Sequence, residues 1–188
     1  MKMELLIILA VIIIYFVFTY NSLVTIKNNV SKAWANIDVL LKQRNDELPK
    51  LIDTCKAYMK HEQETLEKVI KARSGVNNAR EHQDIIGLAA AESALQGSLG
   101  SLFALAENYP ELKADQSFRS LQSRITGLEN AIADRREFYN DSVNVNNVRV
   151  QQFPDLIVAR LTGFNELNLL KFASAELKDI DVNERFNS

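Results

Sequence analysis

The hydrophobic pattern begins with an unbroken apolar run, LLIILAVIIIYFVF, at Leu5–Phe18, and no charged residue lies between Glu4 and Lys27. About 20 uncharged residues, each rising about 1.5 Å along a helix, cover a hydrocarbon core of about 30 Å. Tyr20 then falls at the headgroup level, where amphipathic rings collect. A secretory signal peptide is the alternative, but it has a shorter apolar region and a small-residue cleavage site, which TYNSLV does not supply. The run therefore predicts a retained, single-pass transmembrane anchor at residues 1–20.

Beyond this run, apolar residues recur at alternating steps of three and four, the spacing of one helical stripe carried over many turns. The stripe consists of Leu23, Ile26, Val30, Ala33, Ile37, Leu41, Leu48, Leu51, Cys55, Met59, Leu66 and Val69. It predicts one helix from about Asn21 to Ser74, which Gly75 ends. Pro49 removes a backbone donor and clashes with the preceding turn. Because the stripe keeps its register across Pro49, we expect a kink there and not a break.

Two further long helices follow, each with one apolar stripe. The helix from about Asp84 to Asn108 presents Ile85, Leu88, Leu95, Leu99, Leu102 and Ala106. Asp115 is a suitable N-cap for the next helix, which runs to Pro154. A short amphipathic segment, DLIVARLTGF, comes next and is halted by Gly163. Short links between helices make consecutive helices antiparallel neighbours.

The predicted fold class is therefore all-α. The N-terminal transmembrane helix continues into an antiparallel bundle of three long helices plus a short C-terminal helix. The expected domains are the anchor at 1–20, the bundle at 21–163 and a less patterned tail at 164–188. Trp34, Phe118, Phe138, Tyr139 and Phe153 lie at helical spacing, which favours a place in the core over a ligand-binding box.

Several strings of the sequence resemble the bacterial LemA family. The opening of that family is similar to YNSLVTIKNNVSKAWANIDVLLKQRNDELPKLIDTCKAYMKHE, and its closing half is similar to YPELKADQSFRSLQSRITGLENAIADRREFYND and FPDLIVARLTGF. The similarity covers about Tyr20 to Phe164. It implies a single-pass membrane protein with a helical bundle and brings no catalytic residues. Asn146 departs from the family, which usually has a tyrosine there, and the tail after Phe164 follows no family pattern.

Four polar residues occupy positions on the apolar stripes: Arg44, Glu62, Arg135 and Asn146. A buried charge is tolerated only when it is paired and hydrogen-bonded. These residues either fix the register and pairing of the helices, as polar core positions do in coiled coils, or reach water where the stripe drifts off the core. The sequence alone leaves both interpretations open.

The sequence offers no catalytic, cofactor-binding or metal-binding residues. A carboxylate-bridged metal site in a bundle needs Glu-x-x-His pairs, but Tyr58 and Ala79 lie three positions before His61 and His82. A net charge of −2 without a basic stripe argues against nucleic acid as a partner. Cys55 lies on an apolar stripe, as a small buried hydrophobe would. We therefore expect no cofactor and no enzymatic activity.

The second long helix has an additional stripe of small residues on nearly the opposite side from its large apolar residues. This stripe consists of Gly87, Ala90, Ala94, Gly97, Ser101 and Ala104. A helix that merely covers a bundle normally carries charge on its outer face, and glycine disfavours a helix by about 1 kcal/mol relative to alanine. The pattern predicts a self-association face; a bland solvated surface is the alternative.

These features favour a scaffold or interaction protein that is anchored in the lipid bilayer of the bacterial cell (inner) membrane and forms a homo-oligomer. The alternative is a membrane-tethered sensor whose helix packing responds to a ligand or to stress. Lys2 and the terminal amine on one side of the run balance Lys27 and Lys32 on the other, so the positive-inside rule gives a tie. A very short N-terminal tail is easily translocated, which favours a bundle in the cytoplasm, and the family resemblance favours the same side.

Overall fold

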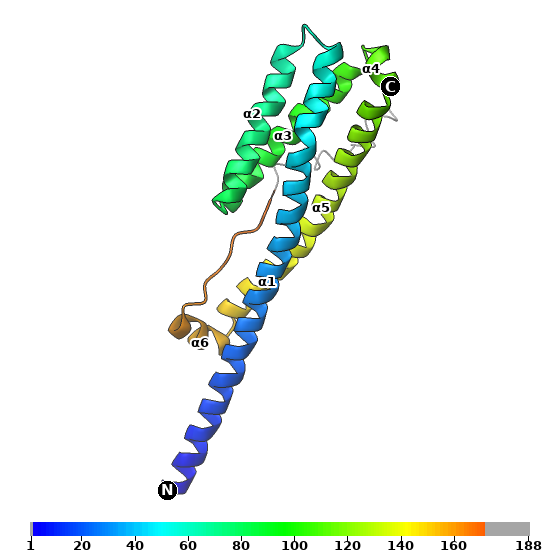
Figure 1. Cartoon of the computed structure of the whole chain (residues 1–188). Helices are drawn as coiled ribbons and strands as arrows, with labels where there is room; N and C mark the ends of the chain where they lie inside the picture. Colours follow the sequence, from blue (N-terminus) through cyan, green and yellow to red (C-terminus); the bar gives the residue numbers. More distant parts are fainter. Residues whose placement is uncertain (1, 172–188) are drawn as a thin grey trace, which may run out of the picture.

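The computed structural model describes residues 2–171, and this range contains six α-helices and no strand (Figure 1). The helices are α1 (Lys2–Tyr58), α2 (Gln63–Glu81), α3 (Ile85–Ala106), α4 (Pro110–Ala114), α5 (Gln116–Gln151) and α6 (Asp155–Thr162). The prediction of an all-α fold is confirmed. The predicted tail from residue 172 onward lies outside the described residues.

Helix α1 is the longest element of the molecule. Its 57 residues extend over about 85 Å. The helix continues through Pro49, as the unbroken stripe predicts. Every residue from Lys2 to Phe18 is exposed, whereas the stripe residues from Leu23 onward are largely buried. The helix therefore has an apolar first third that the protein leaves uncovered and a second part that packs.

The other helices cover α1 to different heights (Figure 1). Helix α5 runs antiparallel to α1 along most of its packed part, and α2 and α3 form a hairpin beside the upper half of this pair. Helix α6 packs against α1 and α5 at the lower end of the pair. The molecule thus passes from four packed helices to two, and then to α1 alone.

The single helix predicted from Asn21 to Ser74 is wrong, because α1 ends at Tyr58 and α2 begins at Gln63. The turn between them contains neither glycine nor proline, and its Met59 is buried. The apolar stripe therefore continues through the turn and hides it from periodicity analysis. Gly75 does not end a helix: it lies inside α2, where an added Cβ would lie 3.7 Å from the Ala91 side chain of α3. The bundle consequently has four long helices and not three.

The predicted helix ends at three polar or glycine positions are confirmed. Asp84 caps α3 by accepting a hydrogen bond from the backbone nitrogen of Gly87 at 2.9 Å. Asp115 caps α5 through the backbone nitrogen of Phe118 at 2.8 Å. Gly163 ends α6 with φ 77, in the left-handed region that glycine adopts without a Cβ penalty. In both capped helices, an acceptor side chain satisfies a backbone donor that the helix leaves free.

The main core is made by apolar residues of α1, α2, α3 and α5 with Leu112 of α4. Its largest fully buried side chain is that of Phe118. Trp34 of α1 packs edge-on against Tyr139 of α5 with ring centroids 6.0 Å apart. The expectation that these three aromatic residues contribute to the core is therefore confirmed.

Two other aromatic residues expected in the core are instead exposed: Phe138 by 54% and Phe153 by 76%. Phe138 comes directly before the buried Tyr139, and successive residues of a helix point to different sides. Phe153 lies beyond the end of α5 at Gln151, so the stripe of that helix does not govern it. The helical spacing of these two rings therefore did not predict whether they are buried.

Candidate functional site

The four polar residues that interrupt the stripes have different surroundings in the structure. Arg44 and Asn146 are buried, with 3% and 2% of their surfaces exposed. Glu62 lies in the turn between α1 and α2, where its Oε1 accepts a hydrogen bond from the Tyr109 hydroxyl at 2.9 Å. Arg135 is exposed on α5. Arg44 and Asn146 thus lie inside the structure, where a role in register remains a prediction, whereas Arg135 reaches water.

Arg44 belongs to a buried charge cluster that joins three helices. Its guanidinium on α1 forms an ion pair with the Glu92 carboxylate on α3, and both side chains are nearly inaccessible. Glu129 of α5 faces the same cavity, which has a volume of about 30 Å³, roughly the share of one water in the liquid. Breaking such a pair on one side leaves an uncompensated charge in a low-dielectric interior. A shift of α1 relative to α3 that separates Arg44 from Glu92 is therefore costly, and Glu129 of α5 adds a second carboxyl group to the same cavity.

The third member of this cluster has an altered proton affinity. Burial raises the pKa of the Glu129 carboxyl, the positive charge of Arg44 opposes that rise, and the negative charge of Glu92 adds to it. An acid whose pKa is higher in the folded than in the unfolded state destabilises the fold once it is ionised. The penalty grows as the pH rises from the unfolded pKa, near 4.5, through the folded pKa, and it is complete above that value.

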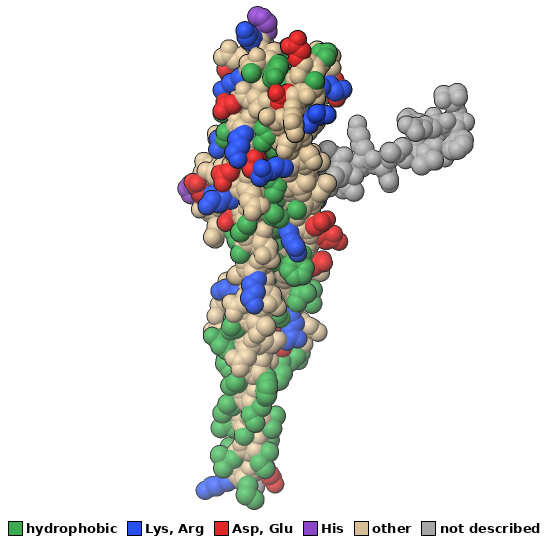
Figure 2. Space-filling view, turned by 45° about the vertical axis from the view of Figure 1, so that its right-hand side comes forward, with side chains coloured by type: hydrophobic (Ala, Val, Ile, Leu, Met, Phe, Trp, Pro, Cys, Tyr) green, Lys and Arg blue, Asp and Glu red, His purple; other side chains and the backbone are tan. Residues whose placement is uncertain are grey.

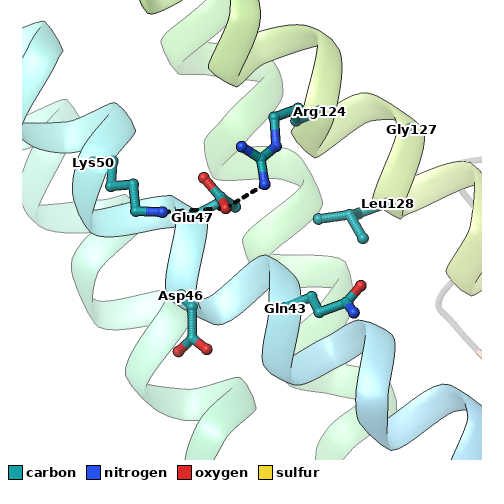
Figure 3. Close-up of a pocket in the computed structure, with 7 residues that line it drawn as sticks. All are labelled: Gln43, Asp46, Glu47, Lys50, Arg124, Gly127 and Leu128. Carbon is teal, nitrogen blue, oxygen red and sulfur yellow. Dashed lines mark hydrogen bonds and ion pairs between the residues drawn. The ribbon is translucent and has the colours of Figure 1, made fainter.

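A second set of charges connects α1 to α5 directly. The buried Glu47 carboxylate accepts hydrogen bonds from Arg124 at 2.8 Å and from Lys50 at 3.2 Å (Figure 3). These residues line an open groove of about 650 Å³ together with Gln43, Asp46, Gly127 and Leu128. Because the exposed Arg124 reaches across to a carboxylate that is only 8% exposed, the contact fixes the offset between the two antiparallel helices.

Asn146 is one of several α5 residues that hold the segment after α6. This segment, Asn165–Lys171, runs back along the bundle in an extended conformation (Figure 1). Asn147 donates to the Leu167 carbonyl at 2.9 Å and accepts from the Leu167 nitrogen at 2.8 Å. Asn140 makes the same pair of bonds with Leu170, at 3.1 and 2.8 Å. Asn146 adds one bond to the Asn165 carbonyl at 3.0 Å.

The spacing of the two bidentate asparagines matches the strand-like segment. Seven helical residues advance about 10.5 Å, and three extended residues advance about 10 Å. Asn140 and Asn147 are therefore spaced to meet Leu170 and Leu167 in turn. The buried Leu170 side chain, 1% exposed, joins the main core. The start of the predicted tail at 164 is consequently part of the packed structure up to Lys171.

The predicted small-residue face of α3 is mostly exposed in the single chain. Ala90, Ala94, Gly97, Ser101 and Ala104 are exposed, whereas the opposite stripe of large residues is buried. Gly87 is the exception: it is half-buried, and an added Cβ would collide with the capping carboxylate of Asp84. The only charged residue of α3 is Glu92, which is turned inward to Arg44. The outer face of α3 therefore carries no charge at all.

Residues 2–171 offer little for metal binding or for thiol chemistry. This range has no group of three or more His, Cys, Asp or Glu side chains placed to hold a metal ion. Cys55 is fully buried, and burial raises the pKa of its thiol to about 12. A thiol with such a pKa stays protonated at neutral pH and is a poor nucleophile. Cys55 is thus a core residue, as predicted.

Sequence reasoning missed the partners of these polar residues. Glu92 lies between Leu88 and Leu95 at steps of four and three, so it occupies a stripe position and the signal for its burial was present. Glu47 and Glu129 carry no such signal, because each lies beside the stripe; a neighbouring helix buries Glu47 and half-buries Glu129. Asn140 and Asn147 share a heptad spacing, but that spacing has meaning only once the extended segment is known.

The fold and the charged residues together define a class: helical-bundle proteins with a long N-terminal helix that begins with an apolar run, and with ion pairs between helices. The sequence pattern of the LemA family matches residues 33–183, so the expectation that the tail after Phe164 follows no family pattern is wrong. The chain therefore belongs to the LemA family. It is 27% identical to Protein LemA of Metamycoplasma hominis over 183 residues, which is 96% of this chain and 82% of that protein.

Two magnetosome proteins are similar over a smaller part. Magnetosome protein MamQ of Magnetospirillum gryphiswaldense is 23% identical over 171 residues, 79% of this chain and 63% of that protein. Magnetosome protein MamQ 1 of Paramagnetospirillum magneticum is 23% identical over 168 residues, 77% of this chain and 62% of that protein. The chain spans less than two thirds of the length of these magnetosome relatives.

Proposed function

We propose that this LemA-family chain is a scaffold or interaction protein, anchored in the cell membrane of a bacterium, and that it self-associates there without catalysing a reaction. The observation that carries the proposal is the uncovered apolar surface at the start of α1. From Leu5 to Ile14 every side chain is exposed, and the large ones are exposed by half or more. A soluble protein rarely leaves so large a contiguous apolar surface in water.

The dimensions of α1 support the membrane assignment. Within residues 2–171, α1 is the one helix long and apolar enough to cross a membrane. As a helix, the uncharged stretch from Leu5 to Ile26 is about 33 Å long, compared with about 30 Å for a hydrocarbon core. The helix then continues into the bundle without a loop, so the anchor and the bundle form one continuous element.

For the side of the membrane, we propose that the bundle lies in the cytoplasm, the side that the resemblance to the LemA family favours. A cysteine at the exposed Lys71 of α2, in a Cys55→Ala background, is expected to resist a membrane-impermeant thiol reagent in intact spheroplasts and to react after lysis. Ready labelling before lysis would place the bundle outside.

For self-association, we propose that the outer face of α3 receives a helix of a second copy. Small side chains permit close approach of another backbone, and Ala90, Ala94, Gly97, Ser101 and Ala104 follow one exposed stripe on a helix face without charge. The Ser101 hydroxyl donates a hydrogen bond to the Gly97 carbonyl at 3.0 Å, so this donor stays satisfied when the face is covered and water is removed. Ile86 at the start of the same helix is 69% exposed and adds apolar area.

Replacing Gly97 with leucine is expected to lower the assembled mass of the full-length protein in mild detergent toward that of one 21.3 kDa chain. The added Cβ meets no atom within 4 Å in the single chain. Leucine also has the higher helix propensity, so the fold is expected to persist by circular dichroism. Gly127→Leu on α5 is the matched control, because a Cβ there also meets nothing within 4 Å. Equal masses for both variants and the parent would contradict this role of α3.

A further inference from the structure

The short helix α6 has an outer face that the rest of the described chain leaves uncovered. Val158 and Ala159 of its inner face are buried against Leu23 and Val150. Residues at steps of four lie on one side of a helix. Ile157 and Leu161 have this spacing on the outer face and are exposed by 52% and 73%, and Phe153, in the turn just before the helix, is exposed by 76%. An amphipathic helix normally turns such residues inward. This face therefore needs a partner.

The level of α6 along α1 limits what that partner is. The Tyr15 hydroxyl of α1 donates to the Asp155 carboxylate at the start of α6 at 2.7 Å. Glu4 is the last charge before the apolar run, and Tyr15 lies about 16 Å beyond it along the helix. A hydrocarbon core is about 30 Å thick. If α1 spans the membrane, α6 lies beside the last turns of the span and not above them.

The one acidic residue of α6, Asp155, has the surroundings that this level requires. Charged side chains at membrane depth pair with one another and face the protein interior. Asp155 is 6% exposed, and its second oxygen lies 2.9 Å from the Arg149 guanidinium, which also donates to the Ser22 hydroxyl at 3.2 Å. The carboxylate is thus paired with the Arg149 cation and hydrogen-bonded by the Tyr15 hydroxyl, on the side of α6 away from the exposed apolar residues.

Aromatic and basic residues follow at the end of α6 that lies nearer the bundle. Tyr20 and Phe164 pack edge to face with ring centroids 6.0 Å apart, and the Lys27 ammonium lies 5.7 Å from the Phe164 centroid. Such residues collect where the hydrocarbon core meets the headgroups. The exposed Arg160 suits the same anionic boundary. Figure 2 shows hydrophobic side chains covering the N-terminal end of the molecule up to the height at which α6 lies in Figure 1.

From this geometry we propose that α6 is a second membrane contact: Phe153, Ile157 and Leu161 insert among the acyl chains of the leaflet next to the bundle. The inference rests on the proposed α1 anchor. A lipid surface fits better than a protein partner because the exposed face of α6 continues the exposed apolar surface of α1, whose Phe18 is 73% exposed. The chain would then be held by a span and a flanking interfacial helix, which fixes the tilt of the bundle on the membrane.

The test places a nitroxide label on the full-length chain in vesicles of phosphatidylethanolamine and phosphatidylglycerol. Single cysteines replace Leu161, Ile12 or Lys71 in a Cys55→Ala background, which removes the one native cysteine. Collision rates with oxygen, which concentrates in lipid, and with a water-soluble nickel chelate are compared. The Leu161→Cys label is expected to share the oxygen preference of the Ile12→Cys label, whereas the Lys71→Cys label on the exposed face of α2 prefers the chelate.

Each other outcome overturns a defined part of the proposal. A Leu161 label that prefers the chelate while the Ile12 label prefers oxygen would place α6 in water and leave the anchor intact. A Leu161 label shielded from both reagents would assign its face to another protein copy and not to lipid. An Ile12 label that prefers the chelate would remove the anchor itself, and with it the basis of the inference.

Discussion

Replacing Arg44 with methionine is expected to lower the free energy of unfolding of the bundle by about 3–5 kcal/mol, the usual cost of removing one partner of a buried ion pair. The substitution removes the ion-pair partner of the Glu92 carboxylate, which is 3% exposed, and Glu129 faces the same cavity. For a chain of this size the loss corresponds to a fall in melting temperature of about 10 °C. Thermal unfolding of the full-length protein in detergent, followed by circular dichroism at pH 7, measures it.

Arg135→Met is the matched control, since it removes the same charge from an exposed position on α5. Surface substitutions of this kind usually change stability by less than about 0.5 kcal/mol. The double variant Arg44→Met/Glu92→Met is expected to recover most of the loss, because it replaces both charges with apolar groups. Equal destabilisation by Arg44→Met and Arg135→Met would show that the cluster does not fix the helices.

The same thermal unfolding measurement tests the contribution of the Glu129 carboxyl group to stability. Because its pKa is raised in the fold, Glu129→Gln removes a penalty that exists only when the carboxyl is ionised. The variant is expected to melt above the parent at neutral pH. The difference shrinks as the pH falls through the folded pKa and disappears below the unfolded value near 4.5. A difference that persists unchanged below that pH would assign the effect to packing instead.

The elements that the sequence predicts well are those that local chemistry decides. The uncharged run of α1 is long enough to be identified as a helix from the sequence alone. Asp84, Asp115 and Gly163 satisfy backbone groups at helix ends, whatever the arrangement of the rest of the chain. Pro49 was predicted to kink the helix without breaking it, and α1 does continue through Pro49. These features need no knowledge of tertiary structure.

The features that the sequence does not predict are decided by packing between distant segments. The turn after Tyr58 is closed by the hydroxyl contacts of Tyr58 with Asp115, at 3.1 Å, and of Tyr109 with Glu62, and no local breaker marks it. Gly75 looks like a stop signal until α3 is seen to lie against it. The Glu92 partner of Arg44 lies 48 residues away, so only the hairpin of α2 and α3 brings the two together.

The candidate interaction surfaces fall between these two cases. The small-residue stripe of α3 was visible as a pattern, and the structure adds that Gly87 is held by the Asp84 cap and is not part of the free face. The outer face of α6 was hidden, because Phe153 was expected in the core. A periodic pattern shows which residues share a side of a helix but does not show which side packs against a neighbour. Because α6 is short, its buried side can be identified only from its contacts with α1.

The largest expected effect on localisation comes from two aspartates in the apolar run. Ile12 and Ile13 are exposed by 58% and 54% near the middle of the uncharged stretch. An aspartate at the centre of a spanning helix costs about 2.5–3.5 kcal/mol on insertion scales, so the pair costs about 5–7 kcal/mol. Such a cost is large enough to prevent insertion of α1. Val39→Asp/Ile86→Asp adds the same charge at exposed apolar positions of the bundle and is the control.

Flotation of carbonate-washed membranes in a density gradient tests the anchoring of the chain most directly. The parent and the Val39→Asp/Ile86→Asp variant are predicted to float with the lipid, and Ile12→Asp/Ile13→Asp is predicted to remain at the bottom with the soluble proteins. If the Ile12→Asp/Ile13→Asp protein floats with the membranes as the parent does, α1 is not the anchor.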